Sequence, residues 1–335
     1  MPYDLDSRLV IGVASSALFD LTDSHAAFKG GITAYRDFQK AHEDVPLEPG
    51  VAFPFIQRLL GLNDIAPVGD PLVEVFVLSR NDPVTGLRVM SSLEHHALPI
   101  TRAIFTEGQS PYPYMEELNM SLFLSGNRAD VDAAMALGFP SGLVLGTAAV
   151  GTDPSIDRGH GELRVAFDFD GVLADDASEA VNQSEGLPAF QHLESTNKFT
   201  PHNPGPLHRF VQALSRIQRS EKAHAADDTD YVPRVRVSIV TARNAPAHAR
   251  AVNTLREWKL IVNDAFFLGG VEKAKILRVL RPHIFFDDQH GHLDPVQHAV
   301  ASVLVPYGVM NAAQDTVVEA VPDRPAEPLG VAGNL

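Results

Sequence analysis

An internal duplication constrains the fold of this chain more than any other feature of its 335 residues. Segment 31–50 aligns without a gap on 186–205, and two glycines, two prolines and an alanine coincide at an offset of 155 residues (186 − 31 = 155). Farther along, 77–82 aligns on 239–244 at an offset of 162 (239 − 77 = 162), which an insertion near 221–230 in the second copy explains. Two matching windows in the same order favour duplication over a chance likeness.

Each copy alternates short apolar runs with amphipathic segments. The apolar runs predict strands, and examples lie at 9–14, 73–79, 121–125, 164–170, 234–241 and 283–288. Strand–helix alternation predicts an α/β fold with a largely parallel sheet. We expect a first domain, a linker rich in Gly, Asp and Pro, a second domain and a flexible tail, at 1–150, 151–161, 162–310 and 311–335.

Composition excludes several classes of function. The formal net charge of −15 disfavours a nucleic-acid polymer as partner, because like charges repel. The absence of cysteine excludes disulfides, thiolate catalysis and Cys-ligated zinc. No apolar run is long enough to span a bilayer and the start lacks a signal-peptide pattern, so we expect a cytoplasmic protein with no membrane partner. Composition leaves a homo-oligomer open.

The two copies differ in charge at matched positions. The second copy has Asp168, Asp170, Thr241, Lys273, Asp287 and Asp288 where this alignment places Val13, Ser15, Ser79, Pro111, Ser125 and Gly126 in the first. Clustered carboxylates are costly to bury, and a copy that only had to fold would not need them. We therefore expect the chemistry in 162–310 and a degenerate copy in 1–150.

The charged set falls where a parallel sheet binds ligands. Asp168 and Asp170 follow the first strand of the second copy, Thr241 ends the next, Lys273 precedes a helical run, and Asp287 and Asp288 follow the last strand. Each is ambiguous alone, since an Asp pair is often a solvated turn, Thr241 suits a helix cap, and Lys275 is as plausible as Lys273.

Together these residue types suit metal-assisted phosphoryl transfer. Clustered carboxylates without cysteine are ligands for Mg²⁺. Asp168 can attack phosphorus, and Asp170 can protonate the leaving alkoxide and then activate water. Thr241 and Lys273 can bind the phosphate.

The ordered set resembles the haloacid-dehalogenase (HAD) phosphohydrolase superfamily in DFDGVLAD (168–175), SIVT (238–241), Lys273 and IFFDD (284–288). Longer strings, including RVAFDFDGVLADDASE and SIVTARNAPAHARAVNTLREWKL, resemble the cytosolic 5′-nucleotidase I family, and the similarity spans most of 9–309. One departure is Phe169, which stands where that family has glycine between the two aspartates.

The resemblance implies a Rossmannoid HAD catalytic domain that hydrolyses nucleoside 5′-monophosphates with Mg²⁺, AMP being the preferred substrate. By position, Asp168 is the nucleophile and a metal ligand, and Asp170 is the general acid/base whose backbone carbonyl binds the metal. Thr241 and Lys273 hold the phosphate. Asp288, with Asp287 as the alternative, completes the metal site.

The resemblance also implies a small helical cap at about 176–231, with helices from 176–186 and 206–218, and aromatics such as Phe190 and Phe199 that either stack on a base or pack in the core. The degenerate copy is then a structural partner or a site that binds a nucleotide without cleaving it. Two rival functions stay open, a HAD phosphatase of another small phosphate ester and a nucleotide-binding sensor with vestigial catalysis.

Overall fold

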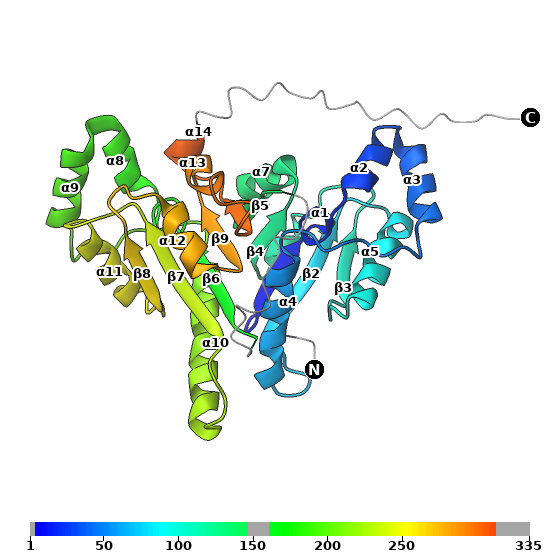
Figure 1. The fold of residues 1–335 in the computed structure, drawn as a ribbon, viewed down its shortest axis with the longest axis horizontal. Coiled ribbons are helices and arrows are strands. Elements are labelled where there is room, and N and C mark those ends of the chain that lie inside the picture. Colours follow the sequence, from blue (N-terminus) through cyan, green and yellow to red (C-terminus); the bar gives the residue numbers. More distant parts are fainter. Residues whose placement is uncertain (1–3, 147–160, 313–335) are drawn as a thin grey trace, which may run out of the picture.

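The computed structural model describes residues 4–146 and 161–312. Its strands are β1 (Leu9–Val13), β2 (Val73–Ser79), β3 (Arg102–Phe105), β4 (Met120–Ser125), β5 (Ser141–Val144), β6 (Leu163–Phe167), β7 (Val235–Thr241), β8 (Asp264–Phe267), β9 (Ile284–Asp287) and β10 (Ser302–Leu304). They form one ten-stranded sheet in the order β3-β2-β1-β4-β5-β10-β9-β6-β7-β8 (Figure 1).

Helices connect these strands. The first half contains α1 (Ser15–Leu18), α2 (Thr22–Phe28), α3 (Ile32–Ala41), α4 (Phe53–Gly61), the 3-10 helix η1 (Leu62–Ile65), α5 (Pro83–His95), α6 (Tyr114–Glu117) and α7 (Arg128–Ala136). The second contains α8 (Ala177–Glu185), α9 (Leu187–Thr196), α10 (His208–Asp227), α11 (His248–Glu257), α12 (Lys273–Leu280), α13 (His290–Leu293) and α14 (Val309–Ala312).

The sheet is buried on both faces. Leu9, Ile11 and Val13 of β1 belong to one hydrophobic core and Val10 to another, because successive side chains of a strand point to opposite faces. The same two-sided burial explains why the central strands read as continuous apolar runs. The predicted α/β fold with a largely parallel sheet is confirmed.

The two halves join through β5 and β10. Among the described strands, this pair alone is antiparallel, with Val303 opposite Val144 and Leu304 opposite Leu143. Because β5 and β10 hold matching places in the two halves, their antiparallel pairing relates the halves by an approximate two-fold rotation. The sequence patterns predicted that β9, which ends at Asp287, is the last strand. This prediction is wrong, because β10 follows β9 in the chain.

The structure repeats at the offsets read from the sequence. β2 and β7 have matching bounds 162 residues apart (235 − 73 = 162), and so do β3 and β8 (264 − 102 = 162). α3 and α9 match at 155 (187 − 32 = 155). Isolated bridges join Phe19 to Pro49 and Ala174 to Pro204, again 155 apart (174 − 19 = 155).

One residue of the sequence alignment needs correction. The amide of Ala14 donates to Leu124 O and that of Asp168 donates to Phe286 O, each at 2.8 Å, so Ala14 and not Val13 matches Asp168. Ser16 then matches Asp170. Gly171 is the extra residue of the second half, and its φ of +70° suits glycine. A Cβ there would lie 2.6 Å from Asp288 Oδ2.

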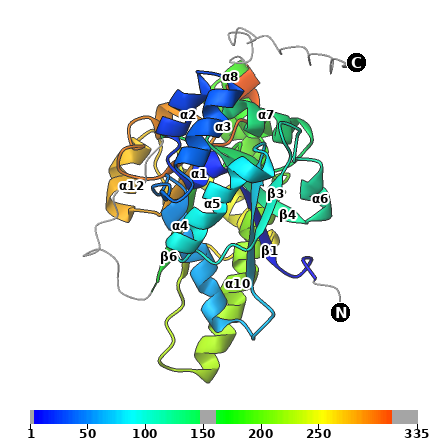
Figure 2. The same cartoon turned by 90° about the vertical axis from the view of Figure 1, so that its right-hand side faces the viewer.

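The helix α10 is not part of a cap, which corrects the expected extent of about 176–231. Its apolar residues Phe210, Val211 and Leu214 are buried, and the Phe210 ring lies 5.9 Å from those of both Phe167 and Phe286. α10 packs against β1, β4 and β7. It extends away from the end of the sheet that lies opposite the carboxyl ends of the strands (Figures 1 and 2). The amphipathic pattern of 206–221 fits a sheet-packing helix as well as a cap helix.

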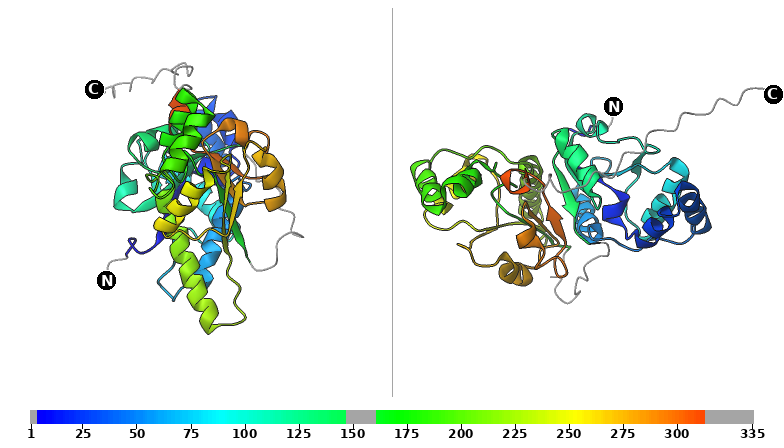
Figure 3. Two further views of the ribbon diagram at one scale, coloured as in Figure 1. Left: turned by 90° about the vertical axis from the view of Figure 1, so that its left-hand side faces the viewer. Right: turned by 90° about the horizontal axis from the view of Figure 1, so that it is seen from above.

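Two helix pairs lie on the side of the strands' carboxyl ends. α8 and α9 stand at one end of the molecule, and the matching pair α2 and α3 at the other (Figures 1 and 3). Within the described ranges, no helix combines the length and apolar character needed to cross a lipid bilayer.

The expected linker and tail fall mainly on positions that the structure does not describe. Residues 151–160 of the linker and 313–335 of the tail lie outside the described ranges. Asn311, which the tail was expected to include, is instead packed: its Nδ2 donates to the carbonyls of Asp288 and Tyr307 at 2.9 and 3.0 Å. The body of the protein therefore extends through α14.

Candidate active site

Three predicted site residues lie at the carboxyl ends of neighbouring strands. Asp168 directly follows β6, Thr241 is the last residue of β7, and Asp287 is the last residue of β9. β6 lies between β9 and β7, so these ends are adjacent. All three side chains are buried. The parallel sheet thus gathers groups that stand 73 (241 − 168), 46 (287 − 241) and 119 (287 − 168) positions apart in the sequence.

Lys273 opens α12, and its ammonium lies between two carboxylates. Nζ is 2.5 Å from Asp168 Oδ2 and 2.7 Å from Asp287 Oδ2. Burial by itself would lower the pKa of Lys273, but the charges of both carboxylates outweigh burial and raise it. Lys273 is therefore a fixed positive charge. Lys275, the alternative, is largely exposed and lies 3.7 Å from Glu272.

Asp168 is buried but ionisable. Burial raises its pKa to about 6, while Lys273 opposes that rise. The backbone amide of Phe169 donates to Asp168 Oδ1 at 2.7 Å, and Lys273 contacts Oδ2. Both oxygens are thereby oriented, and a carboxyl with this pKa is mainly a carboxylate at pH 7.

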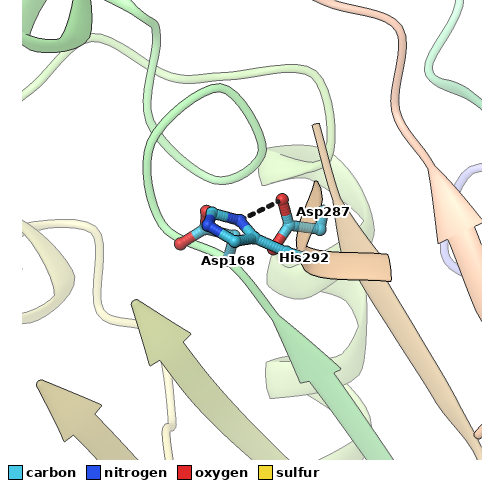
Figure 4. Close-up of side chains that lie close together, drawn as sticks. All are labelled: Asp168, Asp287 and His292. Carbon is cyan, nitrogen blue, oxygen red and sulfur yellow. Dashed lines mark hydrogen bonds and ion pairs between the residues drawn. The ribbon is translucent and has the colours of Figure 1, made fainter. Parts of the chain in front are cut away.

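Both carboxylate oxygens of Asp287 already have hydrogen-bond or ion-pair partners. Beside Lys273, its Oδ1 accepts from the backbone amide of Gln289 at 2.9 Å, and His292 Nδ1 lies 3.0 and 3.1 Å from its two oxygens. Figure 4 shows the imidazole of His292 beside Asp287, with Asp168 next to them. These three side chains form a group that could hold a metal ion. Asp287, however, has less free coordinating capacity than Asp288.

Asp288 is the under-satisfied member of the cluster. It is buried, and its Oδ1 has no hydrogen-bond partner among the described residues. Burial, together with the negative charges of Asp168 and Asp287, raises its pKa to about 9. A buried carboxyl without a donor, next to two further carboxylates, fits a hard divalent cation bound by oxygen ligands.

Asp170 contacts a residue that the sequence patterns did not single out. Arg243, two residues after β7, donates from Nη2 to Asp170 Oδ1 at 2.5 Å and from Nε to Oδ2 at 2.7 Å. The guanidinium is buried between aromatic rings, with Phe169 and Phe190 at 5.0 and 5.2 Å from its centre. Such a two-pronged contact fixes the plane of the carboxylate.

Arg243 continues the ionic chain into the helix pair. Its Nη1 contacts Glu194, a fully buried residue of α9 that also accepts from Arg250 Nη1 at 2.9 Å and from Ser178 Oγ at 2.7 Å. Burial acts to raise the pKa of Glu194, but the hydrogen bond from His202 and the charge of Arg243 outweigh it and lower the pKa. Asp170 is thus tied to α8 and α9 through charged groups.

The first half keeps this framework without the charges of Glu194 and Arg243. Gln39 holds the place of Glu194 (194 − 39 = 155) and accepts from Arg88 Nη1 at 3.2 Å, as Glu194 accepts from Arg250. Asn81 holds the place of Arg243 (243 − 81 = 162). Both residues could have been identified from the sequence. Comparing the charge of every residue with that of its counterpart in the other half, at these offsets, would have singled out Arg243 and Glu194.

The remaining candidate residues differ in their exposure and contacts. Phe190 is buried against Arg243, whereas Phe199 is exposed and lies beside Lys198, so neither ring is free in the site. Outside the predicted set, His290 Nδ1 lies 3.7 Å from Asp294 Oδ1. Thr241 Oγ1 accepts from the backbone amide of Arg243 at 3.3 Å, which shapes the turn after β7.

Comparisons with known proteins identify the family of this chain. Residues 1–312 match the family model described as 5′-nucleotidase. The human protein named cytosolic 5′-nucleotidase 1B is 33% identical over 299 residues, which cover 87% of this chain and 47% of that protein. This chain thus spans about half the length of that curated relative.

A solved structure described as "Structure of Pnkp1/Rnl/Hen1 complex" covers 90% of this chain and 97% of its own, at 12% identity and a TM-score of 0.26, and supports no argument. The family model, in contrast, matches nearly the whole described chain and shows the family. The chain belongs to the 5′-nucleotidase family.

Proposed function

We propose that this protein hydrolyses nucleoside 5′-monophosphates, with AMP preferred, in a Mg²⁺-dependent reaction through an aspartyl-phosphate. The observation that carries the proposal is the buried contact of Lys273 with Asp168 and Asp287, at the carboxyl ends of β6 and β9, in a chain of the 5′-nucleotidase family. A cytoplasmic location is part of the proposal, supported by the word "cytosolic" in the name of the human relative.

Asp168 is the proposed nucleophile. Its carboxylate attacks phosphorus, a bond forms from the Asp168 oxygen, and the bond from phosphorus to the 5′ oxygen of the nucleoside breaks. Lys273 offsets the negative charge that gathers on the phosphoryl group, and Thr241 offers a hydroxyl to a phosphoryl oxygen. A water molecule then attacks the phosphorus and frees phosphate and Asp168.

Asp170 is the proposed general acid and base. It gives its proton to the departing 5′ oxygen, and as a carboxylate it removes a proton from the attacking water. Arg243 is a positioning residue, because its two hydrogen bonds hold the Asp170 carboxylate in one plane. Glu194 extends this positioning to α9, so that the helix pair and the acid are held together.

Asp168, Asp288 and the backbone carbonyl of Asp170 would hold the metal, with Asp287 as the alternative carboxylate. The partnerless Oδ1 of Asp288 and its raised pKa support this choice over Asp287, whose oxygens already contact Lys273 and His292. A bound Mg²⁺ would neutralise phosphate charge that otherwise repels the carboxylates.

Phosphate release from 5′-nucleotides, 3′-nucleotides and sugar phosphates, with Mg²⁺ or with EDTA, tests the proposal. Release confined to 5′-monophosphates in Mg²⁺ supports it and ranks the bases. Release mainly from sugar phosphates would replace the substrate but keep the mechanism. Binding of AMP with no release at all would make the protein a sensor.

A further inference from the structure

The first half contains a hollow at the place that matches the active site. A cavity of about 500 Å³ lies among the ends of β1, β2 and β4 and the helices α2 and α3. Its lining includes Ser16, Ser79 and Asn81, which match Asp170, Thr241 and Arg243 of the second half. The volume falls within the range of about 300–1,000 Å³ that is typical of small-molecule sites.

The first half has smaller, neutral residues where the second half has its charged cluster. In the second half, Lys273 bridges Asp168 and Asp287. The matching first-half residues are Pro111, Ala14 and Ser125, none of which can form an ion pair. Among the described residues, the cavity therefore has no carboxylate at the nucleophile position and no ammonium for a phosphate. It is suited to binding rather than to hydrolysis.

The charged groups that remain are already paired. Arg36 lies 3.2 Å from both Asp82 and Glu107, and Arg80 lies 3.5 Å from Asp130. Apart from His25, the charged lining thus consists of three carboxylates and two guanidiniums. A phosphate would have to displace these contacts and approach excess negative charge. The cavity favours an uncharged ligand.

Apolar rings and polar groups lie on different parts of the wall. Phe28 and Ile32 line the cavity although they are 55% and 54% exposed. The Tyr35 ring stands edge-on to Phe28 with centroids 5.6 Å apart. The Tyr35 hydroxyl donates to Asn81 Oδ1 at 3.2 Å, the backbone amide of Asn81 donates to Ser79 Oγ at 3.1 Å, and within the described residues the side-chain Nδ2 of Asn81 has no hydrogen-bond partner. The apolar rings suit an aromatic base, and the polar groups suit sugar hydroxyls.

We propose that the first-half cavity is a second, non-hydrolytic site that binds a nucleoside, with the base against Phe28 and Tyr35 and the sugar hydroxyls at Ser16, Ser79 and Asn81. The choice of a nucleoside among ring-bearing ligands rests on the proposed function, because a nucleoside is the product which that reaction releases.

Calorimetric titration of adenosine into the full chain tests the site, in an Asp168→Asn background that blocks turnover. The repeat offers a matched pair of variants, because Ile32 and Leu187 are the first residues of α3 and α9 and are 54% and 53% exposed. We expect Phe28→Ala combined with Ile32→Ala to weaken adenosine binding at one site about tenfold, since a lost base–aromatic contact has an effect of that order. Leu187→Ala should leave that site unchanged.

Two results would overturn the site. One is adenosine binding that Phe28→Ala with Ile32→Ala does not weaken. The other is binding of AMP at the affected site about tenfold or more tighter than adenosine, because the phosphate would then be a major determinant. Phosphate release by the wild-type chain separates this proposal from the preceding one. Phosphate release by the wild-type chain, together with adenosine binding that the double variant does not weaken, would refute the second site and keep the hydrolase. Adenosine binding that the double variant weakens, without phosphate release by the wild-type chain, would keep the second site and refute the hydrolase.

Discussion

Arg243 holds the carboxylate of Asp170 by two hydrogen bonds, of 2.5 Å from Nη2 to Oδ1 and 2.7 Å from Nε to Oδ2. The same guanidinium contacts Glu194 of α9. In the first half the three matching residues are the neutral Asn81, Ser16 and Gln39. The first half therefore folds without these charges, which supports the proposed role of their counterparts in the chemistry of the second half.

Arg243→Lys should lower kcat by about a hundredfold and change KM little, within the range seen for disturbed acid–base groups. Lysine keeps the charge but cannot make the two-pronged contact, so Asp170 loses its fixed orientation. Steady-state kinetics on AMP would measure both parameters. The matched control is Asn81→Ala, which should leave kcat at the wild-type value. A wild-type kcat in Arg243→Lys would remove Arg243 from the mechanism.

Glu194→Gln should fold, because Gln39 fills the same place in the first half and still accepts from Arg88. The variant should be less stable than wild type by about 1–3 kcal/mol at pH 7, since a charge-assisted hydrogen-bond acceptor becomes neutral. Urea unfolding would measure the difference. Gln39→Ala, which leaves Arg88 without this acceptor, is the control for simple loss of a buried contact.

The advantage of Glu194 over glutamine should disappear in acid. The pKa of Glu194 is lowered in the folded protein, so its contribution is fully present above the unfolded value of 4.5 and is lost as pH falls from there toward the lower folded pKa. The stability difference between wild type and Glu194→Gln should therefore stay constant from pH 7 to about 5 and shrink below about 4.5. A difference that grows in acid would contradict the sign of this shift.

Mg²⁺ should raise the melting temperature of the wild-type chain and leave that of Asp288→Asn nearly unchanged. Asp288 Oδ1, which has no hydrogen-bond partner among the described residues, is the proposed coordinating atom, and the substitution removes the negative charge of this carboxyl group. Without metal, Asp288→Asn should be at least as stable as wild type, because the buried Oδ1 of this acid has no donor among the described residues. Thermal unfolding with Mg²⁺ and with EDTA measures both. Asp294→Asn, at the exposed residue that follows α13, is the control.

The sequence predicted the α/β class and where the candidate site residues stand on their strands, but not how the two halves join. Asp168, Thr241 and Asp287 were placed correctly at strand ends, because parallel strands bring their carboxyl ends to one edge. The joining of the halves through β5 and β10 has no such signal, because strands of three or four residues carry little periodicity. The role of α10 was misjudged since an amphipathic helix packs equally well on a sheet or in a cap.

Arg243 and Glu194 illustrate a second limit. They lie 49 positions apart and meet only because α9 is placed over the turn after β7 (243 − 194 = 49). Neither stands in a strand-end pattern of aspartates, so motif spacing did not reveal them. The internal duplication supplied the missing comparison, because each charged residue faces a neutral one in the other copy.

The most direct test of the central claim compares phosphate release from AMP in Mg²⁺ by wild type, Asp168→Asn and Ser125→Ala. Wild type should release phosphate, Asp168→Asn should be slower by at least about a thousandfold because the nucleophile is gone, and Ser125→Ala, in the degenerate half, should match wild type. Near-wild-type turnover by a folded Asp168→Asn would refute the assigned nucleophile. A loss in Ser125→Ala as deep as in Asp168→Asn would place the active site in the other half.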